Sequence, residues 1–276
     1  MRRVILIVLA TATAGAGAAL AGPATRTLTA SSGSTSATMT WHANGFSGAL
    51  TPYSDVRIAI RRDGSTLLDR RVDALLCGTL CWPGLATGSP TLAVRDVEGN
   101  GSPDVIVSLF SGGAHCCYIT QVYRYDPGAQ IYAVVQRVTG DPPARLETIA
   151  GASVFLSADD RFAYRFAAYA FSGLPLQIWS VSGGRFVDVT RHYPALLAAD
   201  AKRWWRLFRE NAAQHLGDGA IAAWAADEER LGRAGAVRST LTAQNRLGKL
   251  RNDGGGPGGA AFVRALERFL TQIGYS

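Results

Sequence analysis

The feature that most constrains this chain is a short acidic loop, Asp96-Val-Glu-Gly-Asn-Gly-Ser-Pro-Asp104. It places oxygen-bearing side chains at alternate positions of a glycine-rich turn and ends on a second aspartate. A hard cation such as Ca²⁺ takes roughly six to eight oxygen ligands, and glycine allows the tight backbone curl that a loop around an ion needs. We therefore predict a calcium site with side-chain ligands from Asp96, Glu98, Asn100 and Asp104, and a fifth oxygen from the backbone carbonyl near Ser102.

The residues around the loop decide which kind of calcium site it resembles. An EF-hand requires Glu at the twelfth loop position, which is Val107 here, so an EF-hand is excluded. Residues 105–110 are apolar and typical of a strand. A calcium loop that leads into a strand resembles the repeats of the FG-GAP and VCBS families, known from integrin-type β-propellers. The positions that match their D-x-D/N-G-D/N-G-x-x-D pattern are Asp96, Gly99, Asn100, Gly101 and Asp104.

This resemblance covers one loop and its flanking strands, and it implies a bound calcium ion and propeller-type blades. Glu98 departs from the pattern, because its longer side chain fits a tight loop less well than Asp or Asn. The alternative interpretation is a polar turn that carries a solvated cluster of acids.

The start of the chain is typical of a secretory signal. Arg2 and Arg3 precede an apolar run, and Ala19-Leu20-Ala21 is a cleavage sequence before Gly22. We predict a signal peptide over residues 1–21 and a flexible leader over residues 22–37, which are small and hydroxylated. An uncleaved anchor is the alternative, although the apolar run is short for a membrane span. The mature protein is then secreted, periplasmic or in the cell envelope, without a membrane span.

The charge of the chain argues against nucleic-acid binding. The formal net charge is +7, and cleavage would remove Arg2 and Arg3. Residues 202–206 form the one dense basic run with interleaved aromatic residues, so a nucleic-acid partner is not expected. The expected partner is an unknown protein or a component of the cell envelope.

The four cysteines, Cys77, Cys81, Cys116 and Cys117, indicate disulfides in an exported chain. A bond between adjacent cysteines closes a strained eight-membered ring, so we expect two bridges from the 77–81 loop to the adjacent pair. The glycines before His115 favour the turn that this pairing requires. The alternative is a zinc or copper site formed by His115 and the thiols. The segment 111–117 also resembles a recurrent pattern in uncharacterised exported bacterial proteins.

The hydrophobic pattern predicts an α+β protein in two parts. Residues 38–190 are rich in strand patterns, including one at 162–166, and divide into three units at 37–85, 90–138 and 146–190. Three blades cannot close a propeller, so we expect a partial, open propeller-like domain, with a twisted β-sandwich as the alternative. Residues 191–276 show helical spacing, with Asp200 and Asp218 as expected N-caps and Trp204 and Trp205 as packing residues.

No motif in the sequence indicates an enzyme class. Nucleophile-elbow, zinc-protease, phosphate-loop and dinucleotide patterns are absent. Ser111 and His115 are close in sequence, which is weak evidence for a catalytic pair. We predict an exported calcium-binding structural or ligand-binding protein without catalysis. The alternatives are a secreted calcium-dependent hydrolase and a structural domain with a vacant loop.

Overall fold

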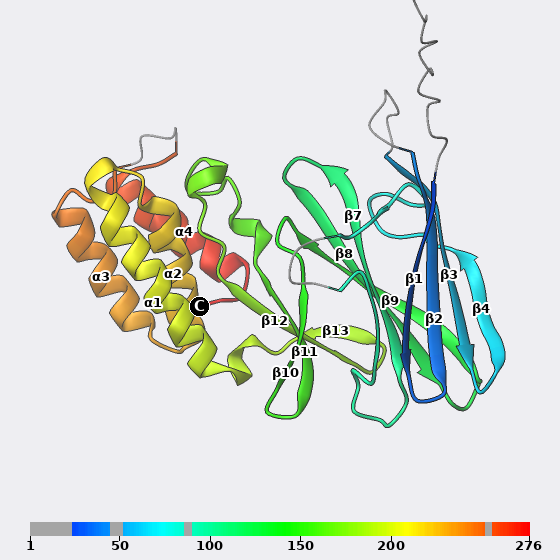
Figure 1. Cartoon of the computed structure of the whole chain (residues 1–276). Coiled ribbons are helices and arrows are strands. Elements are labelled where there is room, and N and C mark those ends of the chain that lie inside the picture. Colours follow the sequence, from blue (N-terminus) through cyan, green and yellow to red (C-terminus); the bar gives the residue numbers. More distant parts are fainter. Residues whose placement is uncertain (1–23, 45–51, 86–89, 252–255) are drawn as a thin grey trace, which may run out of the picture.

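The chain is an α+β protein in which three antiparallel sheets precede four helices, as described by a computed structural model of residues 24–44, 52–85, 90–251 and 256–276 (Figure 1). The signal peptide predicted for residues 1–21 lies outside the described residues. The third sheet stands between the second sheet and the helices (Figure 1). None of the described helices is long and apolar enough to cross a membrane.

The first sheet is a meander of β1 (Ala24–Ser32), β2 (Thr35–Ala43), β3 (Tyr53–Arg62) and β4 (Ser65–Arg71). The prediction of a flexible leader over residues 22–37 is therefore wrong from Ala24 onward. Alternating threonines and a leucine give this segment a strand pattern, since β-branched residues suit a pleated surface. Gly33, with φ of +57°, makes the turn that pairs β1 with β2.

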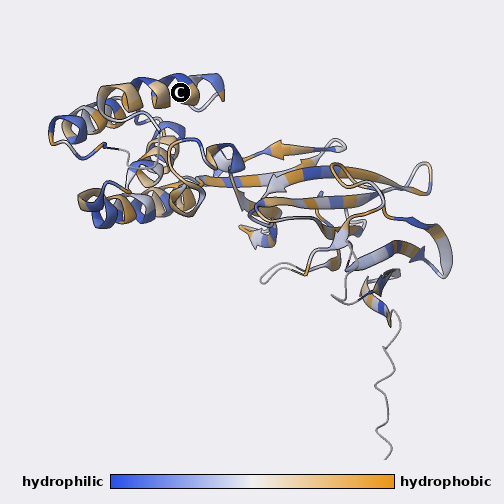
Figure 2. Cartoon of the chain, turned by 90° about the horizontal axis from the view of Figure 1, so that it is seen from above, coloured by the Kyte–Doolittle hydropathy of each residue, from blue (hydrophilic) through white to orange (hydrophobic). Residues whose placement is uncertain are grey.

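The second sheet contains β5 (Trp82–Pro83), β6 (Leu92–Arg95), β7 (Asp104–Gly113), β8 (Cys116–Asp126) and β9 (Ile131–Gly140). Its central strands β7 and β8 are buried over most of the stretch in which they pair with one another. Alternate side chains of the first and second sheets form a shared core, which includes Met39, Ile58, Ile60, Leu109 and Ile119. Figure 2 shows hydrophobic and hydrophilic positions alternating along these strands, as burial of one face requires.

The third sheet is a second meander, β10 (Arg145–Ile149), β11 (Ala152–Ala158), β12 (Leu176–Ser182) and β13 (Arg185–Asp188). A smaller core with Val97, Val122 and Phe155 joins it to the second sheet. The strand predicted at 162–166 is wrong. Two short 3₁₀ helices, η1 (Asp160–Phe162) and η2 (Tyr169–Phe171), occupy this connection, and Phe162 and Phe166 turn into the helical core.

The helical part consists of α1 (Pro194–Asn211), α2 (Asp218–Arg230), α3 (Ala234–Arg246) and α4 (Gly259–Gln272). Asp200 lies inside α1 and is not its N-cap, because Pro194 already begins the helix at a position where its missing N–H costs nothing. Trp204 is buried, and Trp205 lies 5.1 Å from the Trp224 ring. The two tryptophans thus pack within the bundle, as the sequence predicted.

A short 3₁₀ helix, η3 (Thr190–His192), links β13 to α1. It lies at the junction where the third sheet, the helical part and the segment after α4 approach one another (Figure 1). The side chains of this junction form the cavity described below.

Candidate functional site

The acidic loop, residues Asp96–Asp104, closes on its own backbone. The two carboxylate oxygens of Asp96 accept hydrogen bonds from the N–H groups of Gly99, Asn100 and Gly101, at 2.7 to 3.2 Å. Gly99 and Gly101 have φ of +71° and +82°, which supplies the curl. The Asn100 side-chain oxygen accepts from the Ser102 N–H at 2.8 Å. The predicted oxygens therefore serve as acceptors for the turn itself.

The other two acids of the loop also have protein partners. Glu98 accepts from Arg124 Nε at 2.7 Å. Asp104 is 0 % exposed and accepts from the N–H groups of Val97 and Tyr125. Burial, together with the charges of Glu98 and Asp96, raises the pKa of Asp104 to about 6, against the lowering effect of the two hydrogen bonds.

These residues do not fit a calcium shell in this arrangement. Among the described residues, no group of three or more His, Cys, Asp or Glu side chains is placed to hold a metal ion. Instead, the loop joins two sheets: Ser153 on β11 donates to the Asp96 carbonyl at 3.2 Å, and Val97 enters the core between the sheets. The position of the loop is thus explained by packing, and calcium binding stays a prediction.

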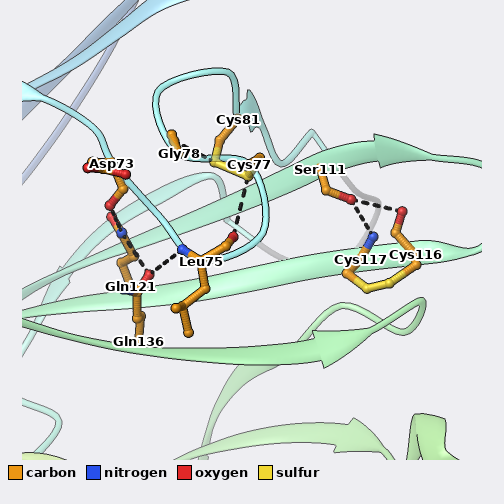
Figure 3. The surroundings of a disulfide bond; sticks show 10 residues. All are labelled: Asp73, Leu75, Cys77, Gly78, Cys81, Ser111, Cys116, Cys117, Gln121 and Gln136. Carbon is orange, nitrogen blue, oxygen red and sulfur yellow. Dashed lines mark hydrogen bonds between the residues drawn. A yellow bond between two sulfur atoms is a disulfide. The ribbon is translucent and has the colours of Figure 1, made fainter.

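All four cysteines are in disulfides, but the predicted pairing is wrong. The bonds join Cys77 to Cys81 and Cys116 to Cys117 (Figure 3). Positive φ at Leu76 and Gly78 folds the 77–81 segment back on itself, so its two cysteines face one another. The alternative metal site fails for the same reason, since paired sulfurs are not thiolate ligands.

Neither Ser111 nor His115 is placed for catalysis. The Ser111 hydroxyl donates to the Cys116 carbonyl at 2.9 Å and accepts from the Cys117 N–H at 2.7 Å (Figure 3). The His115 ring stacks on Tyr169 at 4.0 Å. Ser111 is therefore a turn residue, and its hydroxyl is engaged by the backbone and not by His115.

A second site has no counterpart in the sequence predictions. A cavity of about 500 Å³ lies at the junction of the second sheet, the third sheet and the helices. We call it the arginine cavity, because its lining includes Arg137, Arg161, Arg191 and Arg230, together with Trp179, Asp188, His192 and Tyr275. These four arginines come from β9, η1, η3 and α2.

Two of the arginines are neutralised by carboxylates. Arg230 is 5 % exposed, and its Nη2 donates to both carboxylate oxygens of Asp188, at 2.9 and 2.8 Å. Arg161 donates to both oxygens of Asp159, and this pairing raises its pKa. The Arg161 pair is bidentate, through Nε and Nη2, which fixes the geometry of its guanidinium as well as its charge. Arg161 and Arg230 therefore form the frame of the cavity.

Arg137 has no such partner. Its guanidinium lies over the Trp179 ring, 3.5 Å from the ring centroid. Among the described residues, neither Arg137 Nε nor Trp179 Nε1 has a hydrogen-bond partner, although both atoms are buried. Burial and the nearby Arg161 lower the Arg137 pKa, which is the sign of a cation placed where water is scarce. Buried donors without partners are uncommon and require an explanation.

The residues after α4 complete the cavity. The Tyr275 hydroxyl donates to Asp159 at 2.7 Å and accepts from Arg230 and Gln177. Arg191 donates to the backbone carbonyls of Tyr275 and Arg230, at 2.9 and 3.1 Å, and has no carboxylate within ion-pair distance in the described chain. Burial raises the Tyr275 pKa, so the hydroxyl keeps its proton and remains a donor.

Sequence reasoning could not find this site, because its members are separated by as many as 138 positions, from Arg137 to Tyr275. The one usable signal was the excess of arginine over acid in a β-rich chain, and that signal does not say which arginines meet.

Comparison with known proteins gives two partial relatives. A probable thylakoid lumen protein of Synechocystis is 33% identical over 103 residues, which are 36% of this chain and 30% of that protein. An uncharacterised protein of Sinorhizobium fredii is 36% identical over 90 residues, which are 32% of this chain and 14% of that protein. The chain thus spans less than a third of either relative. No family model and no solved structure matches it.

Proposed function

We propose that this chain is an exported, non-catalytic protein that binds an anionic ligand in the arginine cavity. One observation carries the proposal. Four arginines meet at the cavity against two carboxylates, Asp159 and Asp188, which leaves an excess of two positive charges. Arg137 and Arg191 are the two arginines without a carboxylate partner, so the excess positive charge lies on these two side chains.

The chemistry of arginine suits this role. Guanidinium presents several donors in one plane and matches the geometry of a carboxylate or phosphate. Arg137 is held on Trp179, so little side-chain freedom remains to be lost when a ligand binds. Because the surroundings are partly dry, an anion that reaches Arg137 would interact more strongly than it would at an open surface.

Export is supported by two observations. One partial relative is named a probable thylakoid lumen protein, and a lumenal protein has crossed a membrane. Both cysteine pairs of this chain form disulfides, which persist in oxidising compartments outside the cytosol. We therefore keep the signal peptide at residues 1–21 and a secreted, periplasmic or cell-envelope location as part of the proposal.

Isothermal titration calorimetry with inorganic phosphate and with citrate tests the anion site. We expect saturable binding to the wild type at one site, and a loss of about 10- to 100-fold in affinity in Arg137→Gln, the usual effect of removing a charged donor. Arg185→Gln is the matched control, because Arg185 is an exposed arginine on β13 of the third sheet and lies outside the cavity. Equal loss in both variants, or no binding to the wild type, would overturn the proposal.

Calcium binding by the acidic loop is the second candidate. The favouring observation is that Asp96, Glu98 and Asp104 lie close enough for the first two to raise the pKa of the third. A divalent ion would relieve that repulsion, but Glu98 would first have to leave Arg124. Calcium titration of the wild type beside Glu98→Gln tests it: heat in the wild type alone supports the site, and no heat favours a vacant structural loop. Turnover that appears only with calcium would instead revive the hydrolase alternative.

The three sheets also support a finer proposal about architecture. Each contains a four-stranded antiparallel path in chain order or nearly so, and the three follow one another along the chain. We propose that they are blade-like units of an open, partial propeller, with the helical part beside the last unit. A crystal structure in which neighbouring sheets share no common radial axis would contradict this.

A further inference from the structure

We propose that the anionic ligand is an acidic saccharide, whose carboxylate enters the arginine cavity while its hydroxyl-bearing part occupies a neighbouring cavity. This inference rests on the proposed function and specifies its ligand. It comes from a different part of the molecule, the space between the acidic loop and the third sheet.

The neighbouring cavity has a volume of about 700 Å³. We call it the serine cavity, because Ser153, Ser180 and Ser182 are among the residues that line it, together with Tyr193. Four segments form its walls: the start of the acidic loop at 96–99, the turn before β11 with the first residues of that strand at 150–154, the end of β12 at 180–182, and the residues around η3, Val189, His192 and Tyr193. Most of these segments belong to regular elements or to the loops that join them, so the cavity is built on a fixed frame.

The two cavities are neighbours. Val189 and His192 line both of them, and β12 contributes Gln177 and Trp179 to one and residues 180–182 to the other. On this inference, a ligand longer than a single ion extends from the arginines, past His192, toward the serines. Together the cavities offer more space than phosphate or acetate would fill.

The charges of the two cavities differ in sign, and this decides the ligand class. Asp96 gives the serine cavity a carboxylate that has no ion pair in the described chain, since Glu98 is already paired with Arg124, whereas the arginine cavity has a surplus of cations. A second anionic group on the ligand would be repelled from the serine cavity. Neutral hydroxyl groups would be accepted there, because they donate to carboxylates and exchange hydrogen bonds with serine and tyrosine hydroxyls. One acid group followed by several hydroxyls describes a sugar acid.

Three matched ligands test this inference by calorimetry: acetate, which has the carboxylate alone, glucose, which has the hydroxyls alone, and glucuronate, which has both. We expect glucuronate to bind at least about 10-fold more tightly than acetate, as several added hydrogen bonds imply, and glucose to bind more weakly than glucuronate. Arg137→Gln should weaken both acetate and glucuronate. Ser180→Ala and Ser182→Ala should weaken glucuronate about 2- to 10-fold and leave acetate unchanged.

Ser65→Ala is the matched control, since Ser65 is an exposed serine on β4 in the first sheet. The outcomes separate this inference from the proposed function. If glucuronate binds no better than acetate, the saccharide inference fails and the anion site stands. If neither acid binds, both fail. If glucose binds as well as glucuronate, the arginines do not recognise the ligand and both are overturned.

Discussion

The acidic loop and the arginine cavity are both clusters of charge, and they differ in whether those charges are satisfied. Every carboxylate of the loop accepts hydrogen bonds from the protein: Asp96 from its own turn, Glu98 from Arg124, and Asp104 from two backbone N–H groups. In the cavity, by contrast, Arg137 Nε and Trp179 Nε1 are buried without partners. The comparison teaches that the oxygens of a conspicuous sequence motif can all find hydrogen-bond partners within the fold. Residues that are far apart in sequence can meet with buried donors that have no partner in the described chain.

The largest effect should come from Arg230, which belongs to the frame of the cavity. Arg230→Met leaves Asp188 without its ion partner and the Leu176 carbonyl without a donor. Removing one member of a buried pair costs about 3 to 5 kcal/mol, measured as the free energy of unfolding in urea. Arg233→Met is the control, because Arg233 pairs with Glu228 at the surface and its loss should cost less than about 1 kcal/mol. Similar losses in the two variants would show that Arg230 is not structural.

The loop should respond to pH through Asp104. Its pKa is about 6 in the folded chain against an ordinary 3.8, so the folded state binds the proton more tightly than the unfolded state. The resulting stability is complete below about pH 4 and is lost as pH rises through 6, by about 3 kcal/mol in total.

Asp104→Asn should remove that part of the pH dependence, as seen in urea unfolding at pH 4 and pH 7. The difference between the two proteins is the relevant quantity, because Asp218 and Asp227 on α2 also have pKa values raised by burial, to about 7 and about 10. Identical pH profiles would mean that the loop does not hold Asp104 out of water.

A smaller effect is expected from the pair of Glu98 and Arg124. The Glu98 side chain is mostly buried and Arg124 is partly so. Glu98→Gln should therefore lower the free energy of unfolding by about 1 to 2 kcal/mol, as for a charge-assisted hydrogen bond. Thermal unfolding in the presence of a calcium chelator measures this without interference from ions. A variant that is more stable than the wild type would mean that the hydrogen bond from Arg124 does not offset the cost of burying the Glu98 charge.

The smallest effect on stability should belong to Arg137. Arg137 has no carboxylate partner, and its Nε has no hydrogen-bond partner in the described chain. Arg137→Gln removes the contact with Trp179, which is worth about 1 kcal/mol. Beyond that contact, we expect the free energy of unfolding to change by less than about 0.5 kcal/mol. Urea unfolding of the ligand-free protein measures it. A loss as large as that for Arg230 would make Arg137 a structural residue and remove the contrast between the two sites.

Local patterns predicted much of the fold. Asp63-Gly64 and Ser182-Gly-Gly have the composition of hairpin turns and both make them, and strands, helices and their order follow from periodicity. The errors arise where distant contacts decide the outcome. Phe162 to Phe166 has a strand pattern but packs into the helical core, and β1 forms because β2 offers it a partner.

The candidate sites show the same limit more strongly. The loop was identified from nine consecutive residues, yet the sequence could not show that Arg124, on β8, would form an ion pair with Glu98. The disulfide pairing depended on the backbone at Leu76 and Gly78, which is invisible in a residue pattern. The arginine cavity could not be predicted at all, since it exists only after three parts of the chain have docked.

Tyr275 joins parts of the molecule that are far apart in sequence. Its hydroxyl donates to Asp159, 116 residues earlier, and its carbonyl accepts from Arg191. Two walls of the arginine cavity therefore depend on one residue of the segment after α4. Any displacement of that segment would be passed on to both walls at once, so the shape of the cavity is coupled to the position of α4.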